Sequence, residues 1–186
     1  MGAALARARA FTDAQEPAAG EGDDQASDTR DGTAEDAFDR ALSSATAWLA
    51  RRDHGSAELA TRLERRGFGA AVVARVLEAL QARGYLNDER YAREFVRVHV
   101  ARGQGPLRIR YELVGHGLDA GLAQAALQQI DEADGWGALA RRARQQRFGA
   151  ALPTEPLERA RQMRFLQSRG FSHDHIRAAL GPIDEA

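Results

Sequence analysis

Histidine is the side chain of this sequence that could serve both catalysis and metal binding. The chain has five histidines and no cysteine. Only His173 and His175 stand close together, and two residues apart on a helix their side chains point about 200° from each other. We therefore expect no metal site, no cofactor and no catalytic group. The five histidines are His54, His99, His116, His173 and His175.

A glycine-rich run at residues 103–106 is the second place where a reaction site could lie. A phosphate-binding loop needs a preceding strand and a following lysine. Pro106 is followed by Leu107, and the chain contains no lysine at all. This run therefore predicts a break between helices, and the protein is predicted not to be an enzyme.

Arginine offers a different chemistry, because its planar guanidinium binds phosphates and carboxylates through paired hydrogen bonds. Arg90, Arg93 and Arg97 are spaced i, i+3 and i+7. On a helix they span about 60° of arc, opposite the apolar side chains of the same segment. Similar clusters occur on three further predicted helices. The candidate residues for binding a partner or DNA are Arg62, Arg65, Arg66, Arg90, Arg93, Arg97, Arg108, Arg110, Arg141 and Arg144.

Charge is distributed unevenly along the chain. Residues 1–40 hold 10 acidic residues and 4 arginines, a net charge of −6, whereas residues 41–186 hold 17 acidic residues and 22 arginines, a net charge of +5. If the arginine clusters share one side of the fold, they form a basic surface. Such a surface attracts an acidic protein face or a phosphate backbone.

The elements that position these arginines begin only after a polar segment. Residues 1–35 have almost no large apolar side chains, so they bury too little surface to offset the entropy of ordering. We expect a disordered acidic tail there. No apolar run reaches the ~18 residues of a membrane span, and no signal peptide is recognisable. The absence of cysteine suits a reducing cytosol, so a cytoplasmic location is expected.

The rest of the chain repeats one pattern about every 50 residues. A leucine is followed after four residues by glycine and, ten residues later, by another leucine, which is typical of a helical repeat. Apolar spacings of three and four predict nine helices without strands. We expect an all-α, elongated, monomeric array with repeats at residues 36–84, 85–131 and 132–186. The marker residues are Leu63, Gly67 and Leu77, then Leu113, Gly117 and Leu127, then Leu166, Gly170 and Leu180.

Five segments, in this order and spacing over roughly residues 45–181, resemble the RecX family of bacterial regulators. The segments are Leu49-Ala50-Arg51-Arg52-Asp53-His54, then Glu58-Leu59 with Leu63 and Gly67-Phe68, then Gly84-Tyr85-Leu86-Asn87-Asp88, then Arg102 to Ile109 with Glu112-Leu113 and Gly117, then Arg164-Phe165-Leu166 with Arg169-Gly170-Phe171. One departure is Gly55, where the family usually has serine. Because glycine is an acceptable N-cap, the helix that follows is expected to form.

The resemblance implies three tandem three-helix repeats and a regulatory, non-enzymatic role. Proteins of this family bind the RecA recombinase and its filament on single-stranded DNA. They lower its ATPase, strand-exchange and coprotease activities, and so modulate DNA repair, homologous recombination and the SOS response. The family resemblance therefore makes RecA and its filament the expected partners.

Two other functions remain open from the residues alone. The first is a small helical nucleic-acid-binding protein that contacts phosphate through its arginine stripes. Phe68, Tyr85 and Phe171, at helix corners, could then stack on bases, although their repeat positions favour packing. Possible weak DNA contact is kept alongside the RecA hypothesis. The second is a helical-repeat adaptor of another kind.

Limited proteolysis tests the predicted tail. Because residues 1–35 offer no apolar core, digestion is expected to leave a stable fragment that starts between residues 36 and 45. Mass spectrometry of the fragment gives its first residue. Protection of the first 35 residues would show that the acidic tail is docked on the folded part.

Overall fold

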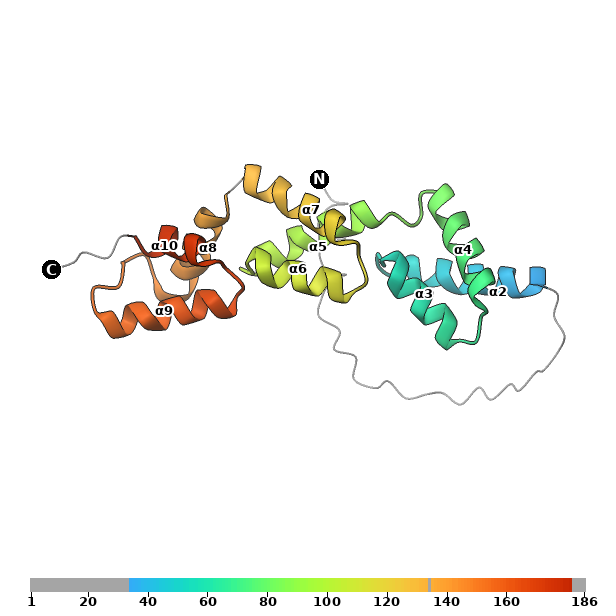
Figure 1. The fold of residues 1–186 in the computed structure, drawn as a ribbon, viewed down its shortest axis with the longest axis horizontal. Coiled ribbons are helices and arrows are strands. Elements are labelled where there is room, and N and C mark those ends of the chain that lie inside the picture. The colour runs from blue at the N-terminus through green and yellow to red at the C-terminus, as the bar shows by residue number, and fades with distance from the viewer. Residues whose placement is uncertain (1–33, 134, 182–186) are drawn as a thin grey trace. The chain divides into compact units, whose positions relative to one another are not determined.

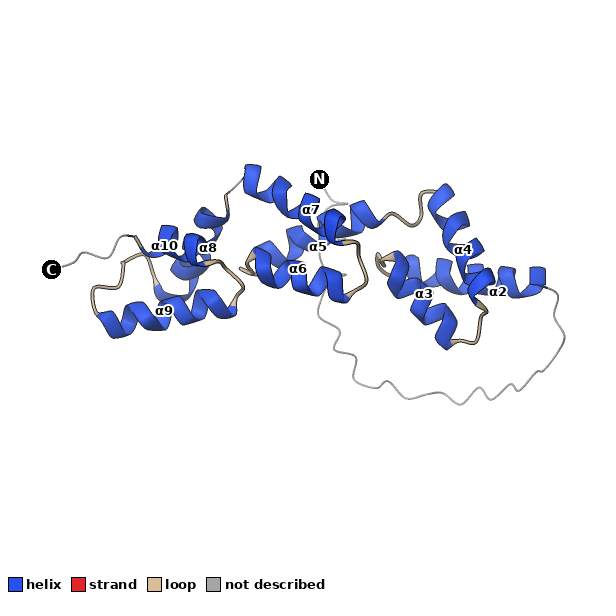
Figure 2. Cartoon of the chain, viewed as in Figure 1, coloured by secondary structure: helices blue, strands red, loops and turns tan. Residues whose placement is uncertain are grey.

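The computed structural model describes residues 34–133 and 135–181, which form nine α-helices and no strand (Figures 1 and 2). Two compact units divide the chain after Asn87. The helices of the first unit are α2 (Ala34–Leu49), α3 (Ser56–Arg65) and α4 (Ala70–Ala82). Those of the second are α5 (Asp88–Ala101), α6 (Pro106–Gly115), α7 (Ala120–Ala133), α8 (Trp136–Phe148), α9 (Pro156–Ser168) and α10 (His173–Leu180). The predicted all-α class of three-helix repeats is confirmed for the described residues.

The start of α2 differs slightly from the prediction. The helix was expected near Asp36 and begins at Ala34, where Glu35 forms an ion pair with Arg75 of α4 at 3.2 Å. A carboxylate in the first turn also favours the helix through its dipole. The predicted tail otherwise lies outside the described residues.

The core of the first unit comes from one face of each of its three helices. The apolar spacing in the sequence predicts this face, because side chains three and four residues apart share one side of a helix. Phe38, Trp48 and Phe68 are half-buried and pack against this core. Phe68 therefore packs within its own unit. The buried side chains are Ala41, Ala45, Leu59, Leu63, Val73, Val76, Leu80 and Leu86.

The second unit contains two three-helix groups, in which α5 and α6 pack on α7, and α8 and α9 pack on α10. Most side chains of this core are apolar, and the buried polar ones, His99, Arg144 and Gln162, are described below. Burying each apolar side chain removes apolar surface from water and stabilises the fold. The large buried apolar side chains include Tyr91, Phe95, Ile109, Leu113, Leu127, Trp136, Leu166, Phe171, Ile176 and Leu180.

The three predicted glycine corners share one conformation and one hydrogen bond. Each glycine is left-handed, which a residue with a side chain rarely adopts. The N–H of the residue after the glycine donates to the carbonyl of the repeat leucine, at 3.1 to 3.2 Å. This bond closes the helix at the same point of each repeat, so the predicted equivalence is confirmed. The corners are Gly67 (φ +86°), Gly117 (φ +80°) and Gly170 (φ +87°).

Side-chain caps or a proline begin several helices. The side chain of Asp119 accepts hydrogen bonds from two N–H groups in the first turn of α7, at 2.8 and 3.1 Å. Ser172 accepts from the N–H of His175, while the imidazole of His175 accepts from the N–H of Ser172. Pro106 is the first residue of α6. These contacts satisfy N–H groups that have no partner inside a helix.

A joint of main-chain atoms connects the start of α6 to the end of α9 (Figure 1). The N–H of Gly105 donates to the carbonyl of Arg169 at 2.7 Å, and that of Leu107 donates to the carbonyl of Gly170 at 3.0 Å. Carbonyls at a helix C-terminus thus meet N–H groups at a helix N-terminus, which also aligns the two helix dipoles favourably. A Cβ on Gly105 would lie 2.5 Å from backbone atoms of Gly170 and Phe171. Glycine is therefore required for this close approach.

Alanine at Gly105 tests the joint. We expect Gly105→Ala to destabilise the second unit by about 1–3 kcal/mol, because its Cβ meets main-chain atoms that cannot rotate away. The control is Gly69→Ala, at the N-cap of α4, where a Cβ meets nothing within 4 Å. It should cost less than about 1 kcal/mol. Urea denaturation compares the two, and equal losses would contradict the role of the joint.

Candidate interaction surfaces

The arginines of α5 lie on the predicted outer side of the helix, and carboxylates of the same helix lie next to Arg93 and Arg97. Arg93 and Arg97 are exposed, while Arg90 is half-buried. Arg97 makes a two-pronged contact with Glu94 at 2.6 and 2.9 Å, which raises the pKa of Arg97. Arg93 lies 3.7 Å from Glu89. These carboxylates lower the net positive charge of the α5 face.

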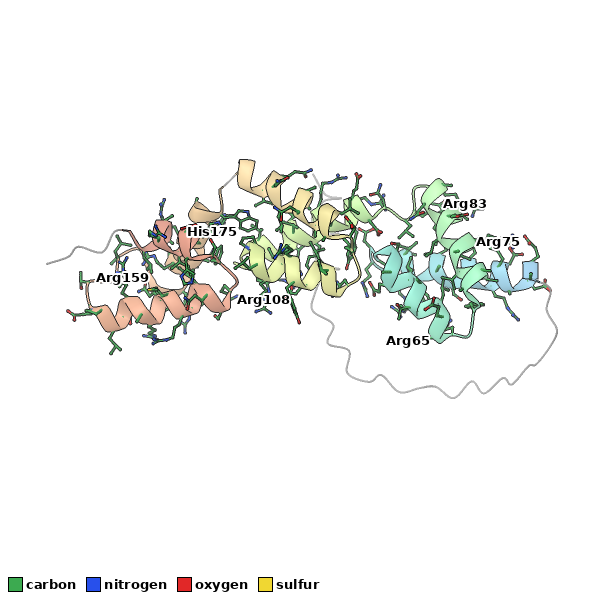
Figure 3. The ribbon with its side chains drawn as sticks, viewed as in Figure 1. Arg65, Arg75, Arg83, Arg108, Arg159 and His175 are labelled. Atoms are coloured by element: carbon green, nitrogen blue, oxygen red, sulfur yellow. The ribbon has the colours of Figure 1, made fainter. Side chains whose placement is uncertain are left out.

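Two arginines, one in α3 and one at its C-cap, stack on an indole ring of α2. The guanidinium groups of Arg62 and Arg66 lie 4.6 and 5.1 Å from the centre of the Trp48 ring. A guanidinium stacked on an aromatic ring keeps its N–H groups at its edge, where they can bind an acceptor. Arg65 is exposed on the same helix (Figure 3). We call Arg62, Arg65 and Arg66 the α3 cluster. The Trp48 ring holds two of its three guanidinium groups in place.

Two candidate arginines stand near the start of α6. Arg108 donates to Glu112 at 2.8 Å on the same helix (Figure 3). Arg110 is exposed and, within the part of the chain that the structure describes, forms no ion pair. Arg108 therefore offers a charge that Glu112 partly offsets, whereas the charge of Arg110 is not offset by a carboxylate of its own helix.

The prediction that Arg144 is a contact residue for a partner or DNA is wrong. Its side chain is fully buried, and its guanidinium donates to the carbonyls of Ala150 and Ala151 and to the side chain of Gln162. These bonds tie the loop between α8 and α9 to the core, so Arg144 does not contact a partner. Arg141 is exposed and donates to the carbonyl of Ala178 at 3.1 Å.

Internal use of arginine extends to the end of the third repeat. Arg159, half-buried on α9, donates to the carbonyls of Leu180 and Gly181 at 3.0 and 2.6 Å (Figure 3). Some arginines of this chain thus donate hydrogen bonds to main-chain carbonyls of the fold, whereas others are exposed on its surface. The α3 cluster belongs to the first unit and the others to the second, so a basic face shared by both units stays a prediction.

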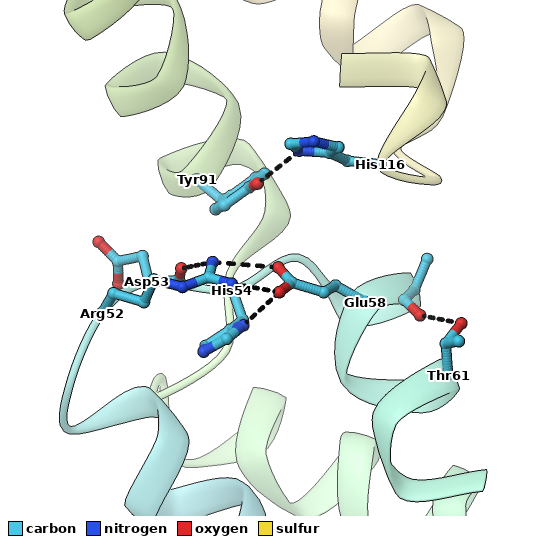
Figure 4. Close-up of polar contacts among 8 residues, drawn as sticks. Arg52, Asp53, His54, Glu58, Thr61, Tyr91 and His116 are labelled. Atoms are coloured by element: carbon cyan, nitrogen blue, oxygen red, sulfur yellow. Dashed lines mark hydrogen bonds and ion pairs between the residues drawn. The ribbon is translucent and has the colours of Figure 1, made fainter. Parts of the chain in front are cut away.

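A charged clamp in the first unit was missed by the sequence analysis. Arg52 and His54, in the corner before α3, both face Glu58 in its first turn (Figure 4). The His54 Nδ1 lies 3.0 Å from the Glu58 carboxylate, and His54 is buried. Burial raises the pKa of Glu58, but the hydrogen bonds and charges of His54 and Arg52 outweigh it and lower this pKa to about 2. The clamp fixes the corner next to the Gly55 cap.

His99, which is buried, and His116 also have partners within the second repeat. His99 stacks on Phe95 with ring centres 3.9 Å apart, and its Nδ1 lies 3.1 Å from Glu112. His116 shares a hydrogen bond of 3.0 Å with the hydroxyl of Tyr91 (Figure 4). Among the described residues, no group of three or more His, Asp or Glu side chains is arranged to hold a metal ion.

The fold defines a class of protein, an all-α protein built from three-helix repeats, and it carries exposed arginines on several of its helices. No described helix is both long and apolar enough to cross a membrane. Models of the first, second and third three-helix domains of RecX match residues 41–85, 87–127 and 138–180. The chain belongs to the RecX family.

Named relatives agree with this assignment. The "Regulatory protein RecX" of Halorhodospira halophila is 47% identical over 137 residues, which cover 74% of this chain and 84% of the relative. That of Chromohalobacter salexigens is 42% identical over 132 residues, covering 71% and 85%. The crystal structure of RecX from Lactobacillus salivarius matches the fold with a TM-score of 0.66 at 21% identity, over 78% of this chain and 95% of that one. The first two relatives are named as regulatory proteins.

Acid titration of stability tests the clamp. Because the pKa of Glu58 is lower in the folded state than its ordinary 4.5, its ionised form stabilises the fold above pH 4.5, and this contribution is lost as the pH falls towards 2. Glu58→Gln should therefore cost roughly 2 kcal/mol at pH 7 and less at pH 3. Urea denaturation at both pH values measures the difference.

The control for this titration is Glu64→Gln, at an exposed carboxylate of the same helix. It should change the free energy of unfolding by no more than about 0.5 kcal/mol at either pH. A loss for Glu58→Gln that is as large at pH 3 as at pH 7 would show that the carboxylate charge is not what stabilises the corner.

Proposed function

We propose that this protein binds RecA and its filament on single-stranded DNA, and inhibits the ATPase, strand-exchange and coprotease activities of RecA. The observation that carries the proposal is the ordered match of all three RecX domains along one chain. By acting on RecA, the protein modulates DNA repair and the SOS response in the cytoplasm. It acts as a monomer and needs no cofactor.

Exposed arginines are the proposed contact residues. Protein partners with acidic faces are attracted by such side chains, which speed association and select the partner. The proposal keeps the division of the chain into an N-terminal tail at 1–35 and repeats at 36–84, 85–131 and 132–186. The exposed or half-buried candidates that it retains are Arg62, Arg65, Arg66, Arg90, Arg93, Arg97, Arg108, Arg110 and Arg141.

Direct binding to nucleic acid is the second candidate function. It is favoured by the stacked arginines on Trp48 and by Tyr85, which is 56% exposed at a helix corner. Phe171 does not support it, because its ring is buried. A salt titration against single-stranded DNA without RecA separates the two functions, since phosphate binding weakens steeply with salt. Tight, salt-sensitive binding to DNA alone would favour the second function.

The decisive measurement is the DNA-dependent ATPase rate of RecA with and without this protein. The parent chain should lower the rate. A variant with Arg93, Arg97 and Arg110 changed to glutamate should require at least tenfold more protein for half-inhibition, about 1.4 kcal/mol, because attraction at the contact becomes repulsion. Its circular dichroism and melting temperature should stay close to those of the parent, because all three side chains are exposed.

A second reversal of equal charge is the control. Arg161, Arg164 and Arg177 are also exposed, and two of them are paired with carboxylates three residues away, as Arg97 is. Changing them to glutamate should leave inhibition within about threefold of the parent, which is within ~0.7 kcal/mol. If both reversals weaken inhibition equally, overall charge rather than the proposed residues governs binding. If the parent does not inhibit RecA, the proposed function is wrong.

A further inference from the structure

An apolar ridge lies exposed on α6. Leu107, Tyr111 and Val114 are 52%, 81% and 45% exposed. Their spacing of i, i+4 and i+7 places them within about 60° of arc, on the side away from the buried Ile109 and Leu113. The described residues contain six large apolar side chains with this degree of exposure, and three of them stand on this ten-residue helix. We call Leu107, Tyr111 and Val114 the α6 ridge.

The other two repeats show that folding does not require this ridge. The repeat leucine and glycine set the register, so each ridge residue has an equivalent on α3 and on α9. No large apolar side chain occurs at any of the six equivalent positions, and four of the six are polar and exposed. The same corner therefore forms with alanine and polar residues in these places. The equivalents are Ala57, Thr61 and Glu64 on α3, and Ala160, Arg164 and Gln167 on α9.

Positive charge borders the ridge on both edges. At about 100° per residue, Arg108 lies on one edge and Arg110 on the other. Glu112, the carboxylate of this helix, bonds to Arg108 and lies 3.1 Å from His99 of α5, towards the interior of the repeat. An apolar strip between two cations fits an apolar groove between carboxylates.

The joint with α9 makes the ridge rigid. The N–H of Leu107, the first ridge residue, donates to the carbonyl of Gly170, and the preceding turn is fixed through Gly105. A binding helix that is already ordered loses little conformational freedom on association, so more of its contact energy appears as affinity.

The chemistry of the ridge favours a protein over nucleic acid. Tyr111 and the two arginines could bind either one, since aromatic rings stack on bases and guanidinium groups bind phosphate. Leu107 and Val114 can neither stack on a base nor donate to a phosphate. Tyrosine and arginine are enriched at the centre of protein interfaces, and the exposed aliphatic side chains beside them add apolar area that such a centre buries.

We propose that the α6 ridge docks into an apolar groove bordered by carboxylates on a RecA subunit, and that this contact holds the protein on the filament. The proposal rests on the proposed function and assigns the docking surface to the second repeat. The arginines on its edges select the groove by charge, and the ridge supplies the buried contact.

A ridge exchange based on the third repeat tests the proposal. In the variant Leu107→Ala, Tyr111→Arg, Val114→Gln, each residue is replaced by its equivalent from α9. The exchange removes the apolar surface and adds one positive charge. We expect half-inhibition of the RecA ATPase to require at least tenfold more protein. A contact that is electrostatic alone, with RecA or with DNA, would instead be unchanged or strengthened by the added arginine.

A pair of single variants controls for folding and for charge. Tyr111→Arg and Leu157→Arg each place an arginine at a highly exposed apolar position, 81% exposed on α6 and 80% exposed on α9. Tyr111→Arg should weaken inhibition at least threefold, whereas Leu157→Arg should stay within twofold of the parent. Both should keep the circular dichroism and the melting temperature of the parent.

Several results would overturn the proposal. The first is half-inhibition of the RecA ATPase by the ridge-exchange variant at the same concentration as the parent. The second is an equal loss of inhibition for Tyr111→Arg and Leu157→Arg. The third is self-association of the parent in sedimentation that the ridge exchange abolishes. The last result would make a second copy of this chain the occupant. Failure of the parent itself to inhibit RecA would refute the proposed function, which is distinguishable because it appears before any variant is compared.

Discussion

Each repeat depends on one leucine that is fully buried and followed by a left-handed glycine. Helices such as α3 and α6, with 10 residues each, are too short to persist alone in water. Leu63 and Leu113 bury one face of them, and the same residues accept, at their carbonyls, the hydrogen bond that ends the helix. Burial and chain reversal are thus coupled at a single position. The arginine faces and the α6 ridge are displayed on elements that this coupling forms.

Sequence reasoning succeeded where the determining interactions are local. Gly117, Asp119 and Ser172 act on N–H and carbonyl groups within a few residues, so their roles follow from their types and spacing. Apolar periodicity likewise predicts which side of each helix is buried. The start of α2 at Ala34 instead of Asp36 reflects how little the first turn of a helix contributes to its energy.

The candidate interaction surfaces were less predictable, because a long side chain can reach either the solvent or a buried polar group. Arg144 was assigned to the surface from its charge, yet carbonyls from a loop after α8 complete its buried site. A signal existed, since Arg144 follows Ala140 by four residues on the apolar stripe. The clamp on Glu58 had a similar signal in its spacing from His54. The apolar face of α6 emerges only when exposure and the repeat register are compared together.

The joint between α6 and α9 also makes the arrangement of the second and third repeats insensitive to pH and ionic strength. Its two hydrogen bonds use peptide groups, which carry no titratable charge, and its close approach requires glycine rather than an ion pair. Added salt screens surface charges strongly but affects short contacts between buried or paired groups much less. The second and third repeats should therefore keep their mutual arrangement over ionic strengths that erase long-range attraction by arginine. A change in partner binding with salt would then reflect weaker attraction between charges and not a rearrangement of these two repeats.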